Sequence, residues 1–270
     1  MLRSLMAHEH GPFDIIGDVH GCYTELVQLL GRLGYQVASS NAGVDLASGP
    51  TYRHSEQRKA VFLGDLVDRG PGILDTLRLV HNIIRAGSGF CVIGNHDDKL
   101  LRKLKGQNVK VTQGLEHTLA EIEALPLEEQ SAFKRELRAF LAALPHHCIL
   151  DDHRLVIAHA GLKQELHGNM SSESRAFALY GETTGQRDEY GLPIRGDWPA
   201  KYAGESWVIY GHTPVPEPRW LNKTVGIDTG CIFGGKLTAL RYPEMETVSV
   251  CAERVYYQSA KPFPRACSSG

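Results

Sequence analysis

Short apolar runs alternate with longer amphipathic segments in the first hundred residues of the chain. Three such runs are "FDII" at 13–16, "KAVFL" at 59–63 and "GFCVI" at 89–93. After the first run, leucines at i, i+3, i+4 and i+7 predict a helix ending near Gly34: Leu26, Leu29, Leu30 and Leu33. The second run precedes a similar apolar face, which predicts a helix from Pro71 to about Gly87. Serial strand and helix units of this kind predict a parallel sheet.

The pattern changes in the middle of the chain. Residues 109–144 are rich in charge, show helical periodicity and contain no strand pattern, so we predict an inserted helical cap there. Residues 146–162 contain two apolar runs around an Asp-Asp-His turn, as in a hairpin, and further short strands follow. The sequence thus predicts one domain over 1–260, with a loose tail at 261–270.

Side chains able to bind metal lie just beyond several of these apolar runs. Because ligands of parallel sheets bind at the carboxyl ends of the strands, these side chains are expected to converge. The candidate metal ligands are Asp18, His20, Asp65, Asn95, His159 and His212.

Six ligands of this kind suffice for two divalent ions. Asp18 and His20 are two residues apart and can face the same side in extended backbone, so we assign them to a first ion. Asp65 is the predicted bridge, and the remaining candidates complete the second ion. Mixed oxygen and nitrogen ligands favour manganese, iron or zinc over magnesium or calcium. Two divalent ions and two carboxylates leave a net charge of +2, which suits a bridging hydroxide and a phosphate ester.

The stretch "GDLVDRG" at 64–70 adds the carboxylate of Asp68 and the guanidinium of Arg69 at the carboxyl end of a predicted strand. An isolated Asp68–Arg69 pair could simply close a surface turn. However, an apolar run, a glycine and a metal-binding residue type recur three times. We therefore predict that Arg69 binds phosphate, and that Asp68 orients His96 as a general acid.

Overall composition restricts the class of protein. Lys and Arg total 29 against 31 Asp and Glu, a formal net charge of -2, so nucleic-acid binding cannot be argued from net charge. The chain has no run of eighteen apolar residues, and its first residues are too short and polar for a signal peptide. A cytoplasmic protein without a membrane partner is expected. The sequence leaves the oligomeric state open.

Five blocks resemble the calcineurin-like metallophosphoesterases of the phosphoprotein phosphatase (PPP) branch. These blocks are "GDVHG", "GDLVDRG", "GNHD", "AHAG" and "YGHT", in that order within residues 14–240. The resemblance implies an α/β sandwich of two mixed sheets flanked by helices. It also implies a dinuclear metal site, with manganese expected and iron, zinc or nickel as alternatives. Asp97 and Ala160 depart from the residues usual in eukaryotic protein phosphatases, which argues against protein dephosphorylation.

Later blocks are most similar to the phosphatase module of bacterial polynucleotide kinase-phosphatases and to bacterial diadenosine tetraphosphatases. They include "ALYGETTG", "DEYGLPIRGDW" and "IDTGCIFGGKLTALRYPE". This resemblance implies that Asp228 is an active-site residue and that Arg195 is a second phosphate ligand. The segment "GCIFGGKL" lacks the spacing and the hydroxyl of a nucleotide-binding P-loop, so no kinase half is predicted.

The predicted activity is dimetal-dependent hydrolysis of phosphomonoesters by a metal-bridging hydroxide. Nucleotides or nucleic-acid ends are the expected phosphorylated substrates, with Asn95 also contacting phosphate. Two enzymatic alternatives are a symmetrical dinucleoside tetraphosphate hydrolase and a Ser/Thr protein phosphatase. A non-enzymatic alternative is a metal-stabilised binding module, against which Asp68, Arg69 and His96 argue because a merely structural site would need none of them.

Overall fold

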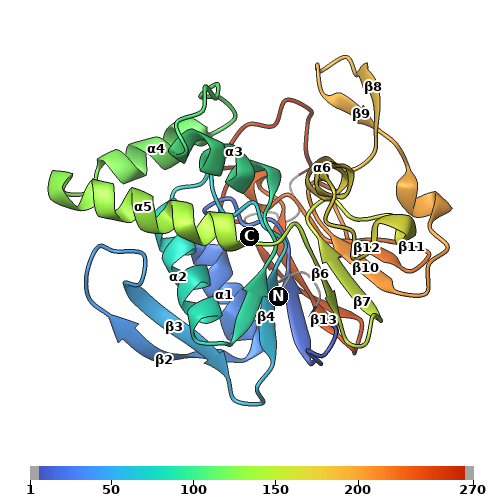
Figure 1. Cartoon of the computed structure of the whole chain (residues 1–270), viewed down its shortest axis with the longest axis horizontal. Coiled ribbons are helices and arrows are strands. Elements are labelled where there is room, and N and C mark those ends of the chain that lie inside the picture. Colours follow the sequence, from blue (N-terminus) through green and yellow to red (C-terminus); the bar gives the residue numbers. More distant parts are fainter. Residues whose placement is uncertain (1–5, 265–270) are drawn as a thin grey trace.

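The computed structural model describes residues 6–264. In this range two five-stranded sheets pack face to face, with helices covering their outer faces (Figure 1). The architecture confirms the predicted α/β sandwich of two mixed sheets. Among the described residues, no helix combines the length and apolar character needed to cross a membrane.

The first sheet has the strand order β14-β13-β1-β4-β5. Its strands are β1 (Phe13–Ile16), β4 (Lys59–Phe62), β5 (Gly89–Cys91), β13 (Lys236–Tyr242) and β14 (Glu246–Cys251). Strands β1, β4 and β5 run parallel, with Ile16 opposite Phe62 and Phe62 opposite Cys91. Their carboxyl ends therefore lie at one edge of the sheet, as the repeated strand and helix pattern predicts.

The second sheet has the order β11-β12-β10-β7-β6. Its strands are β6 (His147–Leu150), β7 (Leu155–Ala158), β10 (Trp207–Tyr210), β11 (Arg219–Leu221) and β12 (Thr224–Gly226). The antiparallel β6–β7 pair is the hairpin predicted from the sequence. Strands β7, β10 and β12 are parallel, so their carboxyl ends also share an edge.

The helices of the first half follow the predicted apolar faces. Helix α1 (Tyr23–Leu33) ends at Gly34, whose left-handed φ of 98° suits glycine. Helix α2 (Ile73–Arg85) begins two residues later than predicted, because Gly72 is its N-cap and Pro71 precedes the cap. The third is α3 (Asn95–Leu104), and the charged insertion contains α4 (Leu115–Glu123) and α5 (Leu127–Ala143).

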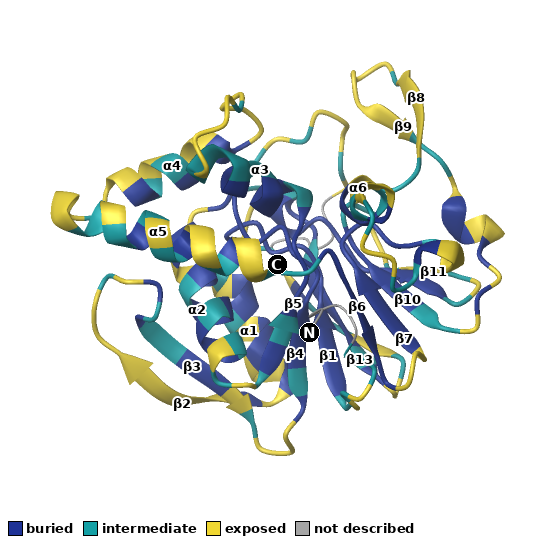
Figure 2. Ribbon diagram, in the orientation of Figure 1, coloured by how far each residue is buried: buried dark blue, intermediate teal, exposed yellow. Residues whose placement is uncertain are grey.

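Burial divides the apolar residues into layers. Alternate residues of β1, β4, β7 and β10 fill the space between the sheets, among them Ile15, Val61, Ile157 and Ile209, all fully buried. A larger cluster joins the outer face of the first sheet to α1, α2 and α3. Figure 2 shows dark blue strands at the centre and exposed outer faces on α4 and α5. The strands are thus fixed on both faces, which gives the loops at their ends a rigid base.

Several elements lie outside these layers. The hairpin β2 (Tyr35–Asn41) and β3 (Gly49–His54) packs beside α2, and its strand pattern was not recognised in the sequence. The hairpin β8 (Thr183–Arg187) and β9 (Pro193–Arg195) projects from the body and is mostly exposed (Figure 2). Helix α6 (Ser172–Tyr180) and the 3-10 turns η1 (Gln164–Leu166), η2 (Trp198–Lys201) and η3 (Cys231–Phe233) complete the described chain. Residues 265–270 of the predicted tail lie outside the described range.

Candidate active site

The loops at the carboxyl ends of the two sheets surround a pocket of about 1030 Å³. Most of the site residues predicted from the sequence line it: Asp18, His20, Asp65, Arg69, Asn95, His96, Arg195, His212 and Asp228. His159 and Asp68 are fully buried behind its wall and contact these residues. The predicted convergence of residues from several strand ends is therefore present in the structure.

Two histidines are held so that one ring nitrogen faces the pocket. His20 Nδ1 donates to the carbonyl of Val67 at 2.8 Å, and His159 Nδ1 donates to the carbonyl of Leu63 at 3.0 Å. Because Nδ1 carries the proton in each ring, Nε2 presents its lone pair. This is the tautomer that a metal ligand requires.

Asp65 lies between these two rings. Its Oδ2 is 3.4 Å from His20 Nε2 and 3.5 Å from His159 Nε2. His159 Nε2 is also 2.9 Å from Asn95 Oδ1 and 3.0 Å from His212 Nδ1. Potential ligand atoms thus form two groups that share the Asp65 carboxylate. This is the arrangement expected of a bridging ligand.

Asp18 follows β1 and is the remaining predicted ligand of the first ion, whereas the first group of ligand atoms in the structure contains His20, Asp65 and His96. The backbone N–H of His212 donates to both of its carboxylate oxygens, at 3.2 and 3.0 Å. Burial, together with the negative charges of Asp228 and Asp65, raises the pKa of Asp18 well above its usual value. Burial likewise raises the pKa of Asp65 and of Asp228 to about 7. So many buried carboxylates are unfavourable unless a cation compensates them.

The donor set fits divalent metal ions. His212 Nε2 is buried and has no hydrogen-bond partner among residues 6–264. Burial lowers the pKa of His159 to about 4 and that of His212 well below its usual range, so both rings are neutral near pH 7. Neutral imidazoles beside carboxylate and amide oxygens are the ligand types of manganese, iron and zinc.

Arg69 connects His20, a predicted metal ligand, to His96. Its Nη1 donates to His20 Nε2 at 2.9 Å, and its Nη2 donates to His96 Nε2 at 2.8 Å. The guanidinium carbon Cζ lies over the rings of Phe233 and Tyr257, at 5.5 and 5.6 Å from their centroids. These stacked rings fix the fork of the guanidinium at the pocket wall.

His96 is oriented from behind by Asp68. Its Nδ1 is 2.7 Å from Asp68 Oδ2, while the hydroxyl of Thr118 donates to Asp68 Oδ1 at 2.6 Å. Burial raises the pKa of Asp68 to about 6, and burial and Arg69 lower that of His96 well below its usual value. In this geometry His96 Nε2 accepts from Arg69 and carries no proton. Its acid role therefore stays a prediction.

Strained backbone marks these loops. His20, Asp65, Asp68, Arg69 and His212 all have positive φ, between 45° and 73°. Such a conformation is unfavourable for residues with a side chain and persists only when surrounding contacts impose it. One such contact joins two loops, since the His20 N–H donates to the Asp65 carbonyl at 2.7 Å.

Three contributors were not identified as such from the sequence. Asp97 is fully buried and accepts the backbone N–H groups of Leu66 and Gly94, each at 3.0 Å, so it holds the loop that carries Asp65. Gly94 itself leaves room for the bridge, because a Cβ there would lie 2.2 Å from Asp65 Oδ1. Thr118 lies on α4, in the insertion predicted as a helical cap. No motif near Thr118 signals its contact with Asp68.

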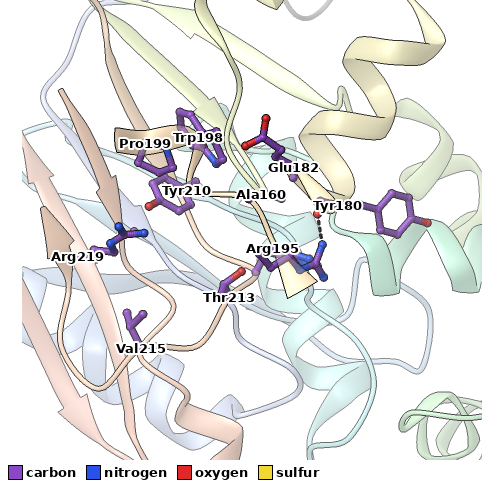
Figure 3. A pocket seen from close by; sticks show the side chains of 14 residues that line it. Ala160, Tyr180, Glu182, Arg195, Trp198, Pro199, Tyr210, Thr213, Val215 and Arg219 are labelled. Atoms are coloured by element: carbon purple, nitrogen blue, oxygen red, sulfur yellow. Dashed lines mark hydrogen bonds between the residues drawn. The ribbon is translucent and has the colours of Figure 1, made fainter. Parts of the chain in front are cut away.

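Arg195 is placed at the opening of a small side cavity of about 80 Å³ (Figure 3). Its guanidinium donates to the carbonyl of Tyr180, and it lines both this cavity and the main pocket. Asp228 accepts the backbone N–H of Gly230 at 3.0 Å. Their predicted roles at the active site stay predictions, although both residues lie at the pocket.

The sandwich and its shared-carboxylate site define the class of a metal-dependent phosphoester hydrolase. Residues 11–216 match the family model described as calcineurin-like phosphoesterase. The chain belongs to this family, as its sequence blocks predict. It is accordingly a phosphoester hydrolase, and the alternative of a noncatalytic binding module is not supported.

The chain is similar over most of its length to proteins named asymmetrical bis(5'-nucleosyl)-tetraphosphatase PrpE. It is 46% identical to the one from Geobacillus sp. (strain WCH70) over 243 residues, covering 90% of this chain and 95% of the relative. It is 45% identical to the one from Bacillus cereus (strain B4264) over 239 residues, covering 88% and 93%.

Solved structures share the fold. A crystal structure of a candidate diadenosine tetraphosphatase is similar with a TM-score of 0.61 and 22% identity, covering 93% of this chain and 98% of that one. A cold-active protein-tyrosine phosphatase from a Shewanella species has a TM-score of 0.54 at 14% identity, with coverage of 94% and 83%. At these identities the similarity establishes the architecture alone.

Proposed function

We propose that this chain hydrolyses dinucleoside tetraphosphates asymmetrically, to a nucleoside triphosphate and a nucleoside monophosphate. The observation that carries this proposal is the pocket of about 1030 Å³, which extends well beyond the metal ligands. A phosphate group alone would fill a small part of that volume. The relatives named as asymmetrical tetraphosphatases, at up to 46% identity over nine-tenths of the chain, support the same substrate.

Residues of the chain have separate tasks in this reaction. Asp18, His20, Asp65, Asn95, His159 and His212 would hold two divalent ions, with manganese as the expected metal. Two divalent ions, when bound, acidify water and stabilise negative charge on the phosphate. Arg69 lines the pocket and donates through Nη1 to His20 and through Nη2 to His96; the same two groups would bind two oxygens of one phosphate by exchanging these contacts.

The leaving nucleotide departs on the His96 side of Arg69 in this proposal. His96 Nε2 faces the guanidinium, and His96 Nδ1 is held by Asp68. A proton delivered from Nε2 would neutralise the departing oxygen, while Asp68 favours the protonated ring by its charge. Arg195 is positioned to contact phosphates farther along the chain of four.

Hydrolysis of phosphomonoesters, predicted from the sequence, stays a prediction that competes with cleavage of the dinucleotide. One assay can test both activities. The purified chain would be stripped of metal, reloaded with Mn²⁺ and given diadenosine tetraphosphate, AMP, a phosphoserine peptide and a 5'-phosphorylated oligonucleotide. Anion-exchange chromatography separates ATP plus AMP, the expected products, from the two ADP molecules of symmetrical cleavage. An Asp65→Asn variant shows whether the activity belongs to this site. Intact dinucleotide beside a cleaved monoester would overturn the proposal.

A further inference from the structure

We propose that residues 257–264, which follow β14, form a substrate-binding wall that contacts the phosphate chain and one base of a dinucleotide. This inference rests on the proposed function. Residues 257–264 all line the pocket that contains Asp18 and Asp65. In Figure 1 this segment, coloured red, loops across the end of the sandwich from which the β8–β9 hairpin projects.

The beginning of this segment is anchored on η3 and α1. The backbone N–H groups of Tyr256 and Tyr257 both donate to the carbonyl of Ile232, at 3.1 Å each. The hydroxyl of Tyr256 donates to the buried carboxylate of Glu25 at 2.7 Å. The ring of Tyr257 then packs on Arg69, with its centroid 5.6 Å from Arg69 Cζ. The segment is therefore tied to a residue of the active site.

The far end of the segment is anchored by Phe263. A Cβ on Gly230 would lie 2.4 Å from Phe263 Cζ, and a Cβ on Gly235 would lie 2.9 Å from Phe263 Cε1. The ring thus occupies space that these glycines leave free, and it packs against Phe233 with centroids 6.1 Å apart. Gly230 also binds the Asp228 carboxylate, so Phe263 lies next to the loop that carries a pocket residue.

Between these two anchors the segment presents the ammonium group of Lys261. Lys261 is exposed, lines the pocket and, within residues 6–264, has no salt-bridge partner. Arg69 and Arg195 are the other guanidinium or ammonium groups lining this pocket. A tetraphosphate chain carries several negative charges, more than the single phosphate at the metal ligands. An unpaired ammonium at the pocket wall suits the phosphates that lie farther away.

The pocket also has apolar surface suited to a nucleoside base. Leu192 and Ile194 of the β8–β9 hairpin are 36% and 37% exposed and line the pocket together with Phe263. Bases stack on aromatic rings and pack on aliphatic side chains through their flat faces. Loss of one such aromatic contact weakens binding by about 10- to 100-fold.

Steady-state kinetics with two substrates tests this role. Phe263→Leu keeps a side chain in the glycine-lined space but removes the aromatic face, and Lys261→Gln removes the charge from an exposed position. Each should lower the ratio of kcat/KM for diadenosine tetraphosphate to that for p-nitrophenyl phosphate, by about tenfold or more for Phe263→Leu. The change should come mainly from KM. Trp220→Ala and Lys105→Gln, on exposed residues outside the pocket, serve as controls and should leave the ratio unchanged.

The outcomes separate the two proposals. A wild-type chain that cleaves p-nitrophenyl phosphate but leaves the dinucleotide intact contradicts the proposed function, and this inference with it. If the wild-type chain cleaves the dinucleotide and both variants keep the wild-type ratio, the binding role of the segment alone is wrong. Metal content, measured for each variant, should equal that of the wild type. A loss of metal together with equal losses on both substrates would assign the segment a purely structural role and overturn the proposal.

Discussion

His96 Nδ1 lies 2.7 Å from Asp68 Oδ2, and this contact is buried beneath the pocket rather than exposed to substrate. The Thr118 hydroxyl holds the other Asp68 oxygen at 2.6 Å, so the carboxylate cannot turn away from the ring. His96 Nε2 consequently faces the pocket and Arg69. In geometry the pair resembles a catalytic histidine and its orienting carboxylate. Substrates whose leaving groups differ in basicity can therefore test whether His96 donates a proton.

The first prediction concerns His96 as the proton donor. His96→Asn should slow cleavage of AMP phenyl ester much more than that of AMP p-nitrophenyl ester, because the phenolate is the more basic leaving group. Positioned acids contribute about 10²- to 10⁴-fold, and most of that loss should fall on the phenyl ester. Asp68→Asn should show the same bias more weakly. Initial rates on both esters provide the measurement.

His8→Asn, at an exposed histidine, is the control for this experiment and should behave as wild type. Metal content should be unchanged in His96→Asn and Asp68→Asn, since neither residue is assigned as a ligand. Equal losses on the two esters with metal retained would mean that His96 binds phosphate or positions Arg69. The acid role would then be wrong.

The second prediction concerns Asp65 as the shared ligand. Its Oδ2 is within 3.5 Å of both His20 Nε2 and His159 Nε2. Asp65→Asn should lower the bound metal below two ions per chain and reduce turnover by more than about 100-fold. Mutation of a residue that only hydrogen-bonds to a metal ligand typically costs about 10- to 100-fold, so a larger loss is expected for a ligand. Elemental analysis of protein reloaded with Mn²⁺ gives the metal content. Asp75→Asn, at an exposed carboxylate on α2, is the control. Retention of two ions with near-normal turnover would rule out the bridge.

The third prediction separates charge from geometry at Arg69. Arg69→Lys keeps the positive charge, but an ammonium group lacks the planar fork that contacts His20 and His96 at once and packs on Phe233 and Tyr257. We expect kcat/KM for the dinucleotide to fall by about 10²-fold. Loss of one hydrogen-bond donor to the negative charge that develops in a transition state has an effect of this size. Arg32→Lys, at an exposed residue of α1, should have no effect. Wild-type kinetics for Arg69→Lys would show that charge alone suffices.

The fourth prediction concerns Arg195, whose guanidinium is held by the Tyr180 carbonyl at the edge of the pocket. Because it lies at the side cavity rather than between the metal ligands, Arg195→Ala should raise KM for the dinucleotide more than it lowers kcat. Arg187→Ala, on the exposed strand β8, is the matched control. If kcat and KM both stay at wild-type values, Arg195 has no part in substrate binding.

The convergence of the predicted site residues at one pocket could be predicted from the sequence, because each residue follows an apolar run directly along the chain. Local order is enough to place Asp18 after β1 and Asp65 after β4, and parallel pairing then brings them to one edge. Thr118 and Phe263 could not be found in this way. Their contacts depend on how α4 and the segment after β14 pack on the finished sandwich, which no local pattern encodes. The β2–β3 hairpin was missed because β2 is exposed beyond Tyr35 and shows no buried alternating face.

The last prediction concerns the pH dependence of metal binding. Burial raises the pKa of Asp65 to about 7, so this carboxyl group binds a proton in the metal-free protein at pH 5.5, and burial raises the pKa of Asp18 well above its usual value. His159, with a pKa lowered to about 4, is already neutral there.

Mn²⁺ must therefore displace protons from the carboxylates but not from this imidazole. The apparent Kd should rise by about tenfold for each unit of pH below 7 and each proton displaced. Titration calorimetry in two buffers of different ionisation enthalpy measures that proton release. Asp65→Asn should release one proton fewer than wild type on binding its remaining ion. A Kd that is constant from pH 5.5 to 7.5, without proton release, would show that these carboxylates are ionised before metal binds.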